Sequence, residues 1–362
     1  MNPVLPMKAR RMHAPTRRPR RSAGMTLVEL MVGITIGMLI VAAMAILFAN
    51  NSRTRAETER SSQKIENGRY ALDVISADLQ HAGFFGEFDP RSIALPAATP
   101  DPCVTASDMA TLRSAMPVYA QGFDSVGAST LACINDVKPG TDVFVVRRAA
   151  NCVDGSAGCT NLATGAPAFQ ASSCNDVSEL GSGVVANFYK LENDVAALTL
   201  HKRDCAAVAD IRRYLVRIYY VANNDVGGDG IPTLKRSELR GAGSGPSAFT
   251  TVSLVQGVEN LQVDWGMDTN NDGAPDTYTA SPEGFGGCNA TTSPTCVERW
   301  TSVVSAKVHV LSRNLERSPG HVDGKSYALG TQTVAAANDN YKRSVFQELV
   351  RLQNPSVRRL LP

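Results

Sequence analysis

The chain has 362 residues, of which 43% are hydrophobic and 19% are charged. This composition is typical of a globular protein and excludes a disordered one, and the length could fill one large domain or two ordinary ones. The net charge of +2 conceals an asymmetry, because residues 1–24 hold seven Lys and Arg residues and no acid, whereas the remainder holds 29 basic and 34 acidic residues. A mildly acidic body argues against nucleic acid as a partner.

An apolar segment follows the basic N-terminus. Residues 25–49 contain a single charged side chain, Glu29. As a helix this segment would be about 37 Å long, enough to cross a bilayer core of about 30 Å. The basic cluster before it predicts a cytoplasmic N-terminus and an external body after Asn50. A secretory signal peptide would have small residues after its apolar region, but Ala23 and Gly24 precede it here. An uncleaved signal anchor is the simpler alternative.

The start of the apolar segment carries a short motif. Residues 24–29, with the sequence GMTLVE, resemble the type IV prepilin motif. The resemblance implies that a prepilin peptidase cuts after Gly24 and methylates the new N-terminus at Met25. It also implies that Glu29 pairs with the N-terminal amine of a neighbouring subunit. A carboxylate within a spanning helix costs about 2.5–3.5 kcal/mol, so an acid there points to a function. The alternative is a Glu29 that is merely solvated near the lipid headgroups.

A polar stretch continues the helical pattern beyond the membrane. Residues 50–84 begin with polar side chains and end with apolar ones, and Gly83 is a plausible stop. One helix is therefore predicted from Met25 to about Ala82, with Gly68 as a weak point within it. The apolar positions that should share its buried face are Ile65, Leu72, Ile75 and Leu79.

Residues 85–362 differ from the helical segment in composition and pattern. Proline and small residues are followed by short β-rich runs between turn signals. We expect an α+β fold, in which a long N-terminal helix, transmembrane in its first half, packs on an antiparallel β-sheet body. The predicted strands cover about residues 142–147, 195–202, 211–222, 231–239, 258–266, 301–312 and 345–352.

Three segments of the body resemble PilW-type minor pilins: residues 217–221 (RIYYV), 231–236 (IPTLKR) and 257–263 (GVENLQV). The resemblance implies a minor pilin that initiates or caps type IV pilus assembly. Its partners would be other minor pilins, the major pilin, the prepilin peptidase and the inner membrane. The resemblance also implies a single-pass inner-membrane protein with a periplasmic body. After assembly the protein would be part of the pilus, where the tip is one candidate location. The absence of a proline at Ile46 and a mature length of 338 residues favour a minor subunit over the bulk filament protein. A type II secretion pseudopilin of the J class is the alternative.

The chain contains eight cysteines, and all of them follow the apolar segment. An even number in a translocated region predicts disulfides, and the absence of a C-x-x-C pair disfavours zinc or thioredoxin-like chemistry. Eight cysteines allow 105 complete pairings, so proximity in the sequence is the only guide. It favours the pairs Cys152–Cys159 and Cys288–Cys296, then Cys103–Cys133 and Cys174–Cys205.

One acidic loop resembles a metal-binding pattern. Asp268, Asn270, Asp272 and Asp276 stand at relative positions 1, 3, 5 and 9, with a glycine at position 6. This spacing matches the front of a calcium loop. Position 12 is Thr279 rather than the glutamate of an EF-hand, so we expect weak calcium binding at most. The alternative is a polar hairpin turn, because Asp, Asn and Gly favour turns without any metal.

The sequence gives little support for catalysis. The histidines are scattered without metal-ligand spacing, and Ser182 and Ser244 lack the strand–turn–helix context of a hydrolase nucleophile. We therefore expect a protein that is not an enzyme and that needs no cofactor other than calcium. A membrane-anchored periplasmic enzyme is a remote alternative for which no catalytic residue can be named.

Overall fold

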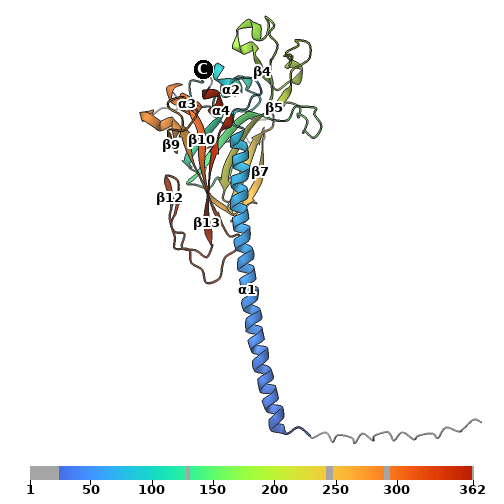
Figure 1. The fold of residues 1–362 in the computed structure, drawn as a ribbon, viewed down its shortest axis with the longest axis vertical. Helices are drawn as coiled ribbons and strands as arrows, with labels where there is room; N and C mark the ends of the chain where they lie inside the picture. Colours follow the sequence, from blue (N-terminus) through green and yellow to red (C-terminus); the bar gives the residue numbers. More distant parts are fainter. Residues whose placement is uncertain (1–23, 128–130, 242–247, 289–293, 361–362) are drawn as a thin grey trace, which may run out of the picture. The chain divides into compact units, whose positions relative to one another are not determined.

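Residues 24–127, 131–241, 248–288 and 294–360 are described in the computed structural model. The chain divides into two compact units within its first helix, between Ala56 and Glu57. The first unit carries the apolar segment, and the second, called the body below, carries every described strand. Figure 1 shows the last turns of this helix lying against the strands of the body.

The first helix, α1, spans Leu27–Gln80, close to the predicted bounds. Its end is fixed by Gly83, which has a φ of +71°, a conformation that a residue with a side chain rarely adopts. The Gly83 N–H donates a 3.0 Å hydrogen bond to the carbonyl of Arg147 in β2 (Thr141–Ala149). The glycine therefore ends the helix and joins the chain to the sheet.

The buried face of α1 differs from the predicted one at its first position. Ile65 is 38% exposed, so its assignment to the buried face was wrong. At this level the helix approaches strand β13 (Arg343–Arg351) through Gly68, where an added Cβ would lie 2.3 Å from the ring of Phe346. Gly68 is thus a packing position within an unbroken helix, because only a residue without a side chain leaves room for the ring. The predicted positions that are buried are Leu72, Ile75 and Leu79.

The larger sheet has seven antiparallel strands in the order β1–β2–β5–β3–β4, and β6 pairs with both β5 and β7. Strand β5 organises this sheet, because it pairs with β2, β3 and β6. The bounds are Ala120–Val126 (β1), Ala168–Ala171 (β3), Tyr189–Glu192 (β4), Ile211–Ala222 (β5), Thr233–Leu239 (β6) and Phe249–Gln256 (β7).

The second sheet has four antiparallel strands in the order β13–β10–β8–β9. A short hairpin, β11–β12, lies in the connection between β10 and β13, and Figure 1 shows it at the opposite end of the body from β4. The bounds are Val258–Met267 (β8), Thr277–Thr279 (β9), Val303–Arg313 (β10), Tyr327–Leu329 (β11) and Gln332–Val334 (β12). The described short helices are α2 (Met109–Ser114), α3 (Pro294–Thr301) and α4 (Gln353–Arg359).

The main core joins α1 to both sheets. Ile75 of α1 belongs to the same buried cluster as Phe144 and Tyr219 of the larger sheet and Trp265 and Val308 of the smaller one. A second buried cluster covers the other face of the larger sheet and includes side chains from the irregular segments that follow α1. A long apolar helix followed by an antiparallel β-sheet body confirms the α+β prediction.

The strand predicted over residues 195–202 is wrong. This segment forms a 3₁₀ turn, Val195–Ala197, followed by an isolated bridge between His201 and Val208. The Asp194 side chain accepts a 3.0 Å hydrogen bond from the N–H of Ala196, so a local side-chain contact replaces a sheet contact. The other predicted strands correspond to β2, β5, β6, β8, β10 and β13 with end positions shifted by a few residues.

Candidate functional site

The prepilin-like motif, residues 24–29, spans the start of α1. Gly24 and Met25 have no regular secondary structure and are exposed. Thr26 caps the helix, because its hydroxyl accepts a 3.2 Å hydrogen bond from the N–H of Glu29. The Gly24–Met25 peptide bond therefore lies in open backbone, as a peptidase requires. Glu29 stands in the first helical turn, where the helix dipole favours a negative charge.

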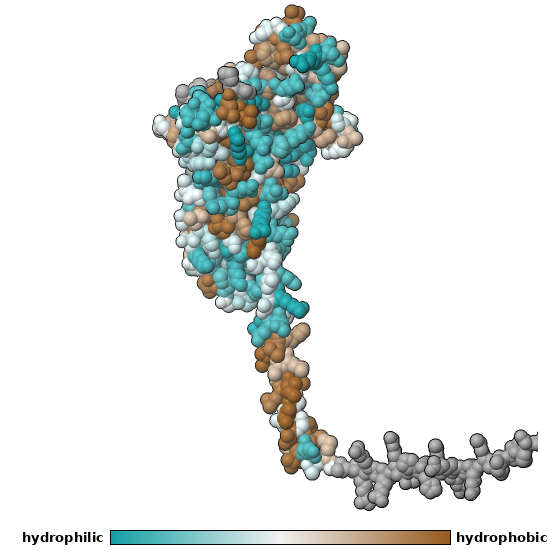
Figure 2. Space-filling model, in the orientation of Figure 1, coloured by the Kyte–Doolittle hydropathy of each residue, from teal (hydrophilic) through white to brown (hydrophobic). Residues whose placement is uncertain are grey.

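The first half of α1 exposes its apolar side chains. Every large apolar residue from Met25 to Phe48 is at least half exposed. Figure 2 shows hydrophobic colour along this segment, whereas hydrophilic and hydrophobic residues alternate over the body. Among the described residues, α1 is the one helix long and apolar enough to cross a membrane, by length and composition. An exposed apolar surface of this extent is stable only against lipid or against other apolar helices.

A buried acid anchors the C-terminal end of α1 to the larger sheet. The Asp78 carboxylate accepts hydrogen bonds from Arg148 (2.8 Å), Arg217 (3.0 Å) and the hydroxyl of Tyr219 (2.8 Å). Burial alone would raise the pKa of Asp78, but the two arginines outweigh it and hold the pKa below its ordinary value. The carboxylate is therefore ionised and joins the helix to β2 and β5.

The same network extends across the sheet to β6. Glu238, which is also buried, is 2.7 Å from Arg217 and 3.0 Å from Arg213. No sequence motif predicts this network. One feature of the sequence could have indicated it: Asp78 directly precedes Leu79, on the side of the helix expected to be buried. An acid in such a position is rarely buried unless it is paired with a base.

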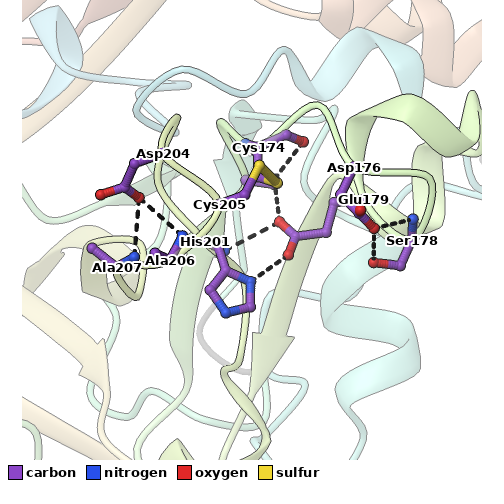
Figure 3. The surroundings of a disulfide bond; sticks show 10 residues. Cys174, Asp176, Ser178, Glu179, His201, Asp204, Cys205, Ala206 and Ala207 are labelled. Carbon is purple, nitrogen blue, oxygen red and sulfur yellow. Dashed lines mark hydrogen bonds and ion pairs between the residues drawn. A yellow bond between two sulfur atoms is a disulfide. The ribbon is translucent and has the colours of Figure 1, made fainter.

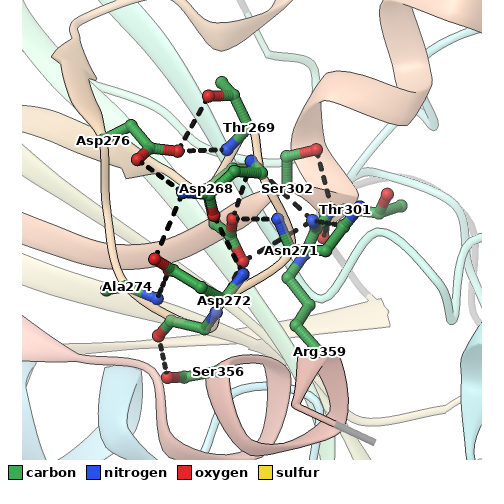
Figure 4. Close-up of polar contacts among 12 residues, drawn as sticks. Asp268, Thr269, Asn271, Asp272, Ala274, Asp276, Thr301, Ser302, Ser356 and Arg359 are labelled. Carbon is green, nitrogen blue, oxygen red and sulfur yellow. Dashed lines mark hydrogen bonds and ion pairs between the residues drawn. The ribbon is translucent and has the colours of Figure 1, made fainter. Parts of the chain in front are cut away.

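The acidic loop after β8 is closed by its own hydrogen bonds (Figure 4). Asp268 is fully buried, and its carboxylate accepts backbone hydrogen bonds from Asn270 (3.2 Å), Asn271 (2.6 Å) and Gly273 (2.9 Å). The guanidinium of Arg359, in α4, lies 3.7 Å from this carboxylate and donates to the Asp268 carbonyl at 3.3 Å. The loop thus serves as a docking site for the C-terminal helix.

The other predicted ligands also bond within the loop. Asp276 accepts 2.7 Å hydrogen bonds from both the N–H and the hydroxyl of Thr269. The Asn270 amide donates to Asp272 and to Asp276, each at 3.2 Å. The four predicted side chains therefore share one loop, but the described residues include no group of three or more His, Cys, Asp or Glu side chains arranged to hold a metal ion. Calcium binding stays a prediction.

Calcium binding is best tested at Asp272, because Asp268 also holds the loop to α4. If the loop binds calcium, we expect weak affinity, with a Kd of about 10⁻⁴–10⁻³ M. Calcium at about 5 mM should then stabilise the wild-type protein by roughly 1–2 kcal/mol, and the Asp272→Asn variant by less. Denaturant unfolding of both proteins with calcium and with EDTA measures the difference. If calcium has the same effect on both proteins, the loop is only a hairpin turn.

Four disulfides join the same cysteines that sequence proximity pairs. Two close short loops, Cys152–Cys159 and Cys288–Cys296, with sequence separations of 7 and 8 residues. Two tie longer segments, Cys103–Cys133 and Cys174–Cys205, the second of which is shown in Figure 3. All four connect parts of the chain outside the described strands, and of the eight cysteines Cys296 lies in a helix, α3. The disulfides fit a body that matures in an oxidising compartment.

Comparison with known families agrees with both resemblances. Residues 218–354 match the family model described as Type IV Pilus-assembly protein W, and residues 19–45 match the Prokaryotic N-terminal methylation motif. The chain is a PilW-type, prepilin-like pilin. The PilW match covers the described smaller sheet together with β6 and β7, whereas residues 46–217 lie outside both matches. A search of the curated proteins and a search of the solved structures found no match.

Processing of this pilin should expose Met25 as the N-terminus. Cleavage after Gly24 follows from the methylation motif and from the open backbone at the Gly24–Met25 bond. Mass spectrometry of the membrane-extracted protein should give a chain that begins at Met25 and carries one methyl group on its amine. An intact leader on the wild-type protein, in cells that contain the peptidase, would contradict this prediction. The Gly24→Val variant is the control: its branched side chain at the cleavage site should block cleavage and leave the leader intact.

Proposed function

We propose that this PilW-type pilin is a minor pilin that takes part in initiating or capping type IV pilus assembly. The observation that supports this most directly is the position of Glu29, four residues after the predicted new amine and at the start of an exposed apolar helix. The last turns of that helix are fixed in the body by Asp78. A subunit of this kind is a structural component rather than an enzyme.

Cleavage and assembly are chemically linked in this proposal. Before cleavage, residue 25 carries an amide and has no charge. After cleavage, each subunit presents an ammonium at Met25 and a carboxylate at Glu29, so one subunit's acid can pair with a neighbour's amine. In a low-dielectric environment such a pair attracts strongly, and either charge left alone is costly. Only processed subunits can then join the growing filament.

The N-terminal part of the chain also supports a location in the inner membrane. The basic leader stays in the cytoplasm, the apolar part of α1 crosses the inner membrane, and the body lies in the periplasm. The disulfides suit that compartment. The prepilin peptidase acts first, and other minor pilins and the major pilin are the later partners. Nucleic acid is not among them, because the chain after the leader is mildly acidic.

The Glu29→Ala variant tests the pairing role. Membrane insertion and cleavage should be retained, because Gly24, Met25 and the apolar side chains of residues 25–49 are unchanged. Incorporation should fall by at least about tenfold, the factor that corresponds to a lost interaction of about 1.4 kcal/mol. Immunoblots of sheared pili, normalised to the protein in the membrane fraction, measure this ratio. Glu59→Ala, which removes an exposed acid beyond the apolar segment, should behave like the wild type.

Wild-type incorporation of the Glu29→Ala variant at equal protein level would contradict the pairing role. A deletion strain separates the pilus from the secretion alternative. Loss of surface pili with normal secretion supports the proposed function, and loss of secretion with normal pili would replace it with a J-class pseudopilin.

A further inference from the structure

Two strands of the body have an open edge. Among the described strands, β13 ends the smaller sheet and pairs with β10 alone, and β7 pairs with β6 alone. Residues 347–349 of β13 and residues 250–253 of β7 are all exposed. Because successive side chains of a strand point to opposite faces, exposure of consecutive residues means that solvent reaches both faces of the strand there. Such an edge can accept a further strand.

The outer backbone groups of β13 can be identified from its pairing with β10. At the end of β13 the N–H of Leu352 donates a 2.9 Å hydrogen bond to the carbonyl of Val304, and the register is unbroken over the whole strand. Hydrogen-bonded pairs recur at every second residue of an antiparallel ladder, so the even-numbered residues of β13 bond to β10. The N–H and C=O groups that point away, and that have no hydrogen-bond partner within the described residues, are those of Val345, Gln347 and Leu349.

The outer backbone groups of β7 follow from the same alternation. The N–H of Arg240 donates a 2.8 Å hydrogen bond to the carbonyl of Ala248, directly before β7, and the pairing with β6 is regular as far as Ser253. The even-numbered residues of this part of β7 therefore bond to β6. The backbone groups of Thr251 and Ser253 point away, and no other part of the chain that the structure describes forms a hydrogen bond with them.

Strand β13 runs in the same direction as α1. Near the start of the strand, the ring of Phe346 lies against Gly68. Beyond its end, the side-chain amide of Asn354 donates a 3.2 Å hydrogen bond to the carbonyl of Ala82, just after α1. Residue numbers therefore rise together along the strand and along this part of the helix.

Strand β7 covers the same length of α1 in the opposite direction, and Figure 1 shows β7 and β13 on opposite sides of the helix. The last residue of β7, Gln256, accepts a 3.0 Å hydrogen bond from the side-chain amide of Asn67. Near the start of β7, Thr250 is in register with Arg217 through β6, and Arg217 bonds to Asp78. The two open edges are therefore antiparallel to each other and lie at the same level of α1.

The side chains of the two edges also lie on matching faces. In β13, Phe346 and Val350 pack toward the main core, so Leu349 lies on the outer face of the smaller sheet. In β7, Phe249 belongs to the second cluster, so Ser253 lies on the outer face of the larger sheet. Residues that oppose each other in an antiparallel pair point to the same face. The two edges can therefore pair without turning an inward side chain outward.

We propose that two copies of this chain join by antiparallel pairing of β13 in one copy with β7 in the other. The second copy fits because one chain supplies both edges, in opposite directions and at the same level. The proposal rests on the proposed function for one condition, that both copies are anchored in the same membrane with their α1 helices parallel. With parallel helices β13 meets β7 in the antiparallel direction, whereas two β13 strands would meet in the parallel direction.

Cysteine cross-linking of the full chain in cell membranes tests the pairing. Two differently tagged copies are produced in one cell, with Leu349→Cys in one copy and Thr251→Cys or Ser253→Cys in the other. Opposed residues of a hydrogen-bonded antiparallel pair have Cα atoms about 5.5 Å apart, within the range that a disulfide bridges. A non-reducing gel should show a mixed dimer for at least one of the two combinations.

Val252→Cys in the second copy is the matched control. Val252 is exposed but lies on the other face of β7 from Thr251 and Ser253. In combination with Leu349→Cys it should give no dimer.

A proline at Gln347 tests the backbone pairing itself. Gln347→Pro removes one outer N–H and spares the bonds to β10, because that N–H points away from β10. Added to the Leu349→Cys copy, it should abolish the mixed dimer. If the proline variant does not accumulate, Gln347→Lys, which places a charge on the open edge, should reduce the yield of the dimer in its place.

The proposal is overturned by any of four results: no mixed dimer in either combination, an equal yield with Val252→Cys, a dimer formed by the Leu349→Cys copy alone, or an undiminished dimer in the Gln347 variants. A cross-link to a different protein in place of the second copy would overturn it as well. The yield is measured in cells that lack the major pilin, so it does not depend on pilus assembly. Loss of the cross-link leaves the minor-pilin function standing, and failure of that function leaves the cross-link unaffected.

Discussion

Replacing Asp78 by alanine should lower the free energy of unfolding of the body by about 3–5 kcal/mol, the usual effect of removing one partner from a buried ion pair. Asp78 is 3% exposed and is bonded to Arg148, Arg217 and Tyr219. Without it, two partly buried guanidiniums lose their shared carboxylate, and the end of α1 loses its polar attachment to the larger sheet. Denaturant unfolding of the full chain, followed by tryptophan fluorescence, measures the difference.

The matched control for this prediction is Asp73→Ala on the same helix. Asp73 is exposed, and surface substitutions usually change stability by no more than about 0.5 kcal/mol. A loss below about 1 kcal/mol for Asp78→Ala would show that apolar packing alone holds α1 to the sheet. Limited proteolysis within residues 57–80 should increase in the Asp78 variant if the helix end detaches locally.

Replacing Arg343 by methionine should have an effect of similar size at neutral pH, again about 3–5 kcal/mol. Arg343 begins β13, and its side chain is 2% exposed. It pairs with Glu259 of β8, with Asp323 at 3.0 Å and with Asp339 at 2.7 Å. Two of these acids lie in the connection that carries the β11–β12 hairpin, so Arg343 fixes that connection to the smaller sheet. Methionine preserves the stem of the side chain and leaves the three acids without their common partner.

The stability deficit of Arg343→Met should depend on pH. The hydrogen bond from Arg343 lowers the pKa of Asp339 to about 2. Burial would raise the pKa values of Asp323 and Glu259, but their contacts with Arg343 keep both below the ordinary range. Acids with a lowered pKa stabilise the fold above their unfolded pKa of about 3.9–4.3, and this contribution is lost as the pH falls through the folded value.

The wild-type protein should therefore lose stability between about pH 5 and pH 2 more steeply than the variant. The difference in unfolding free energy between them should be largest near pH 7 and should shrink toward pH 2, where the acids are protonated. Denaturant titrations at several pH values measure it, with Arg69→Gln as an exposed-arginine control. A difference that stays constant down to pH 2 would show that Arg343 acts through packing rather than through its charge.

The elements that the sequence predicted well are those with a local signal. The apolar segment, its single acid Glu29 and the glycine before Met25 are all contained in a short stretch of chain. The prepilin motif and the membrane-length helix could be inferred from that stretch alone. The end of the helix is predicted by a single residue, Gly83. The central strand over residues 211–222 is predicted by its own β-branched and aromatic side chains.

Only the tertiary structure could decide features whose partners lie far apart in the chain. Ile65 fits the helical period but is exposed, whereas Gly68 lies on the buried face, beside the ring of the distant Phe346 in β13. The loop at Asp268 has a calcium-like spacing, yet its buried carboxylate faces Arg359 from the C-terminal helix. No local pattern contains such a partner, since a side chain's burial and charge environment are set by whichever segment packs against it.

The sequence by itself determined that this chain is a prepilin-like pilin with an apolar helix of membrane-spanning length, because the methylation motif and the apolar segment each lie in contiguous residues. Folding decided where Asp78 and Arg343 stand, because each acquires its charged partners only when distant segments of the chain come together.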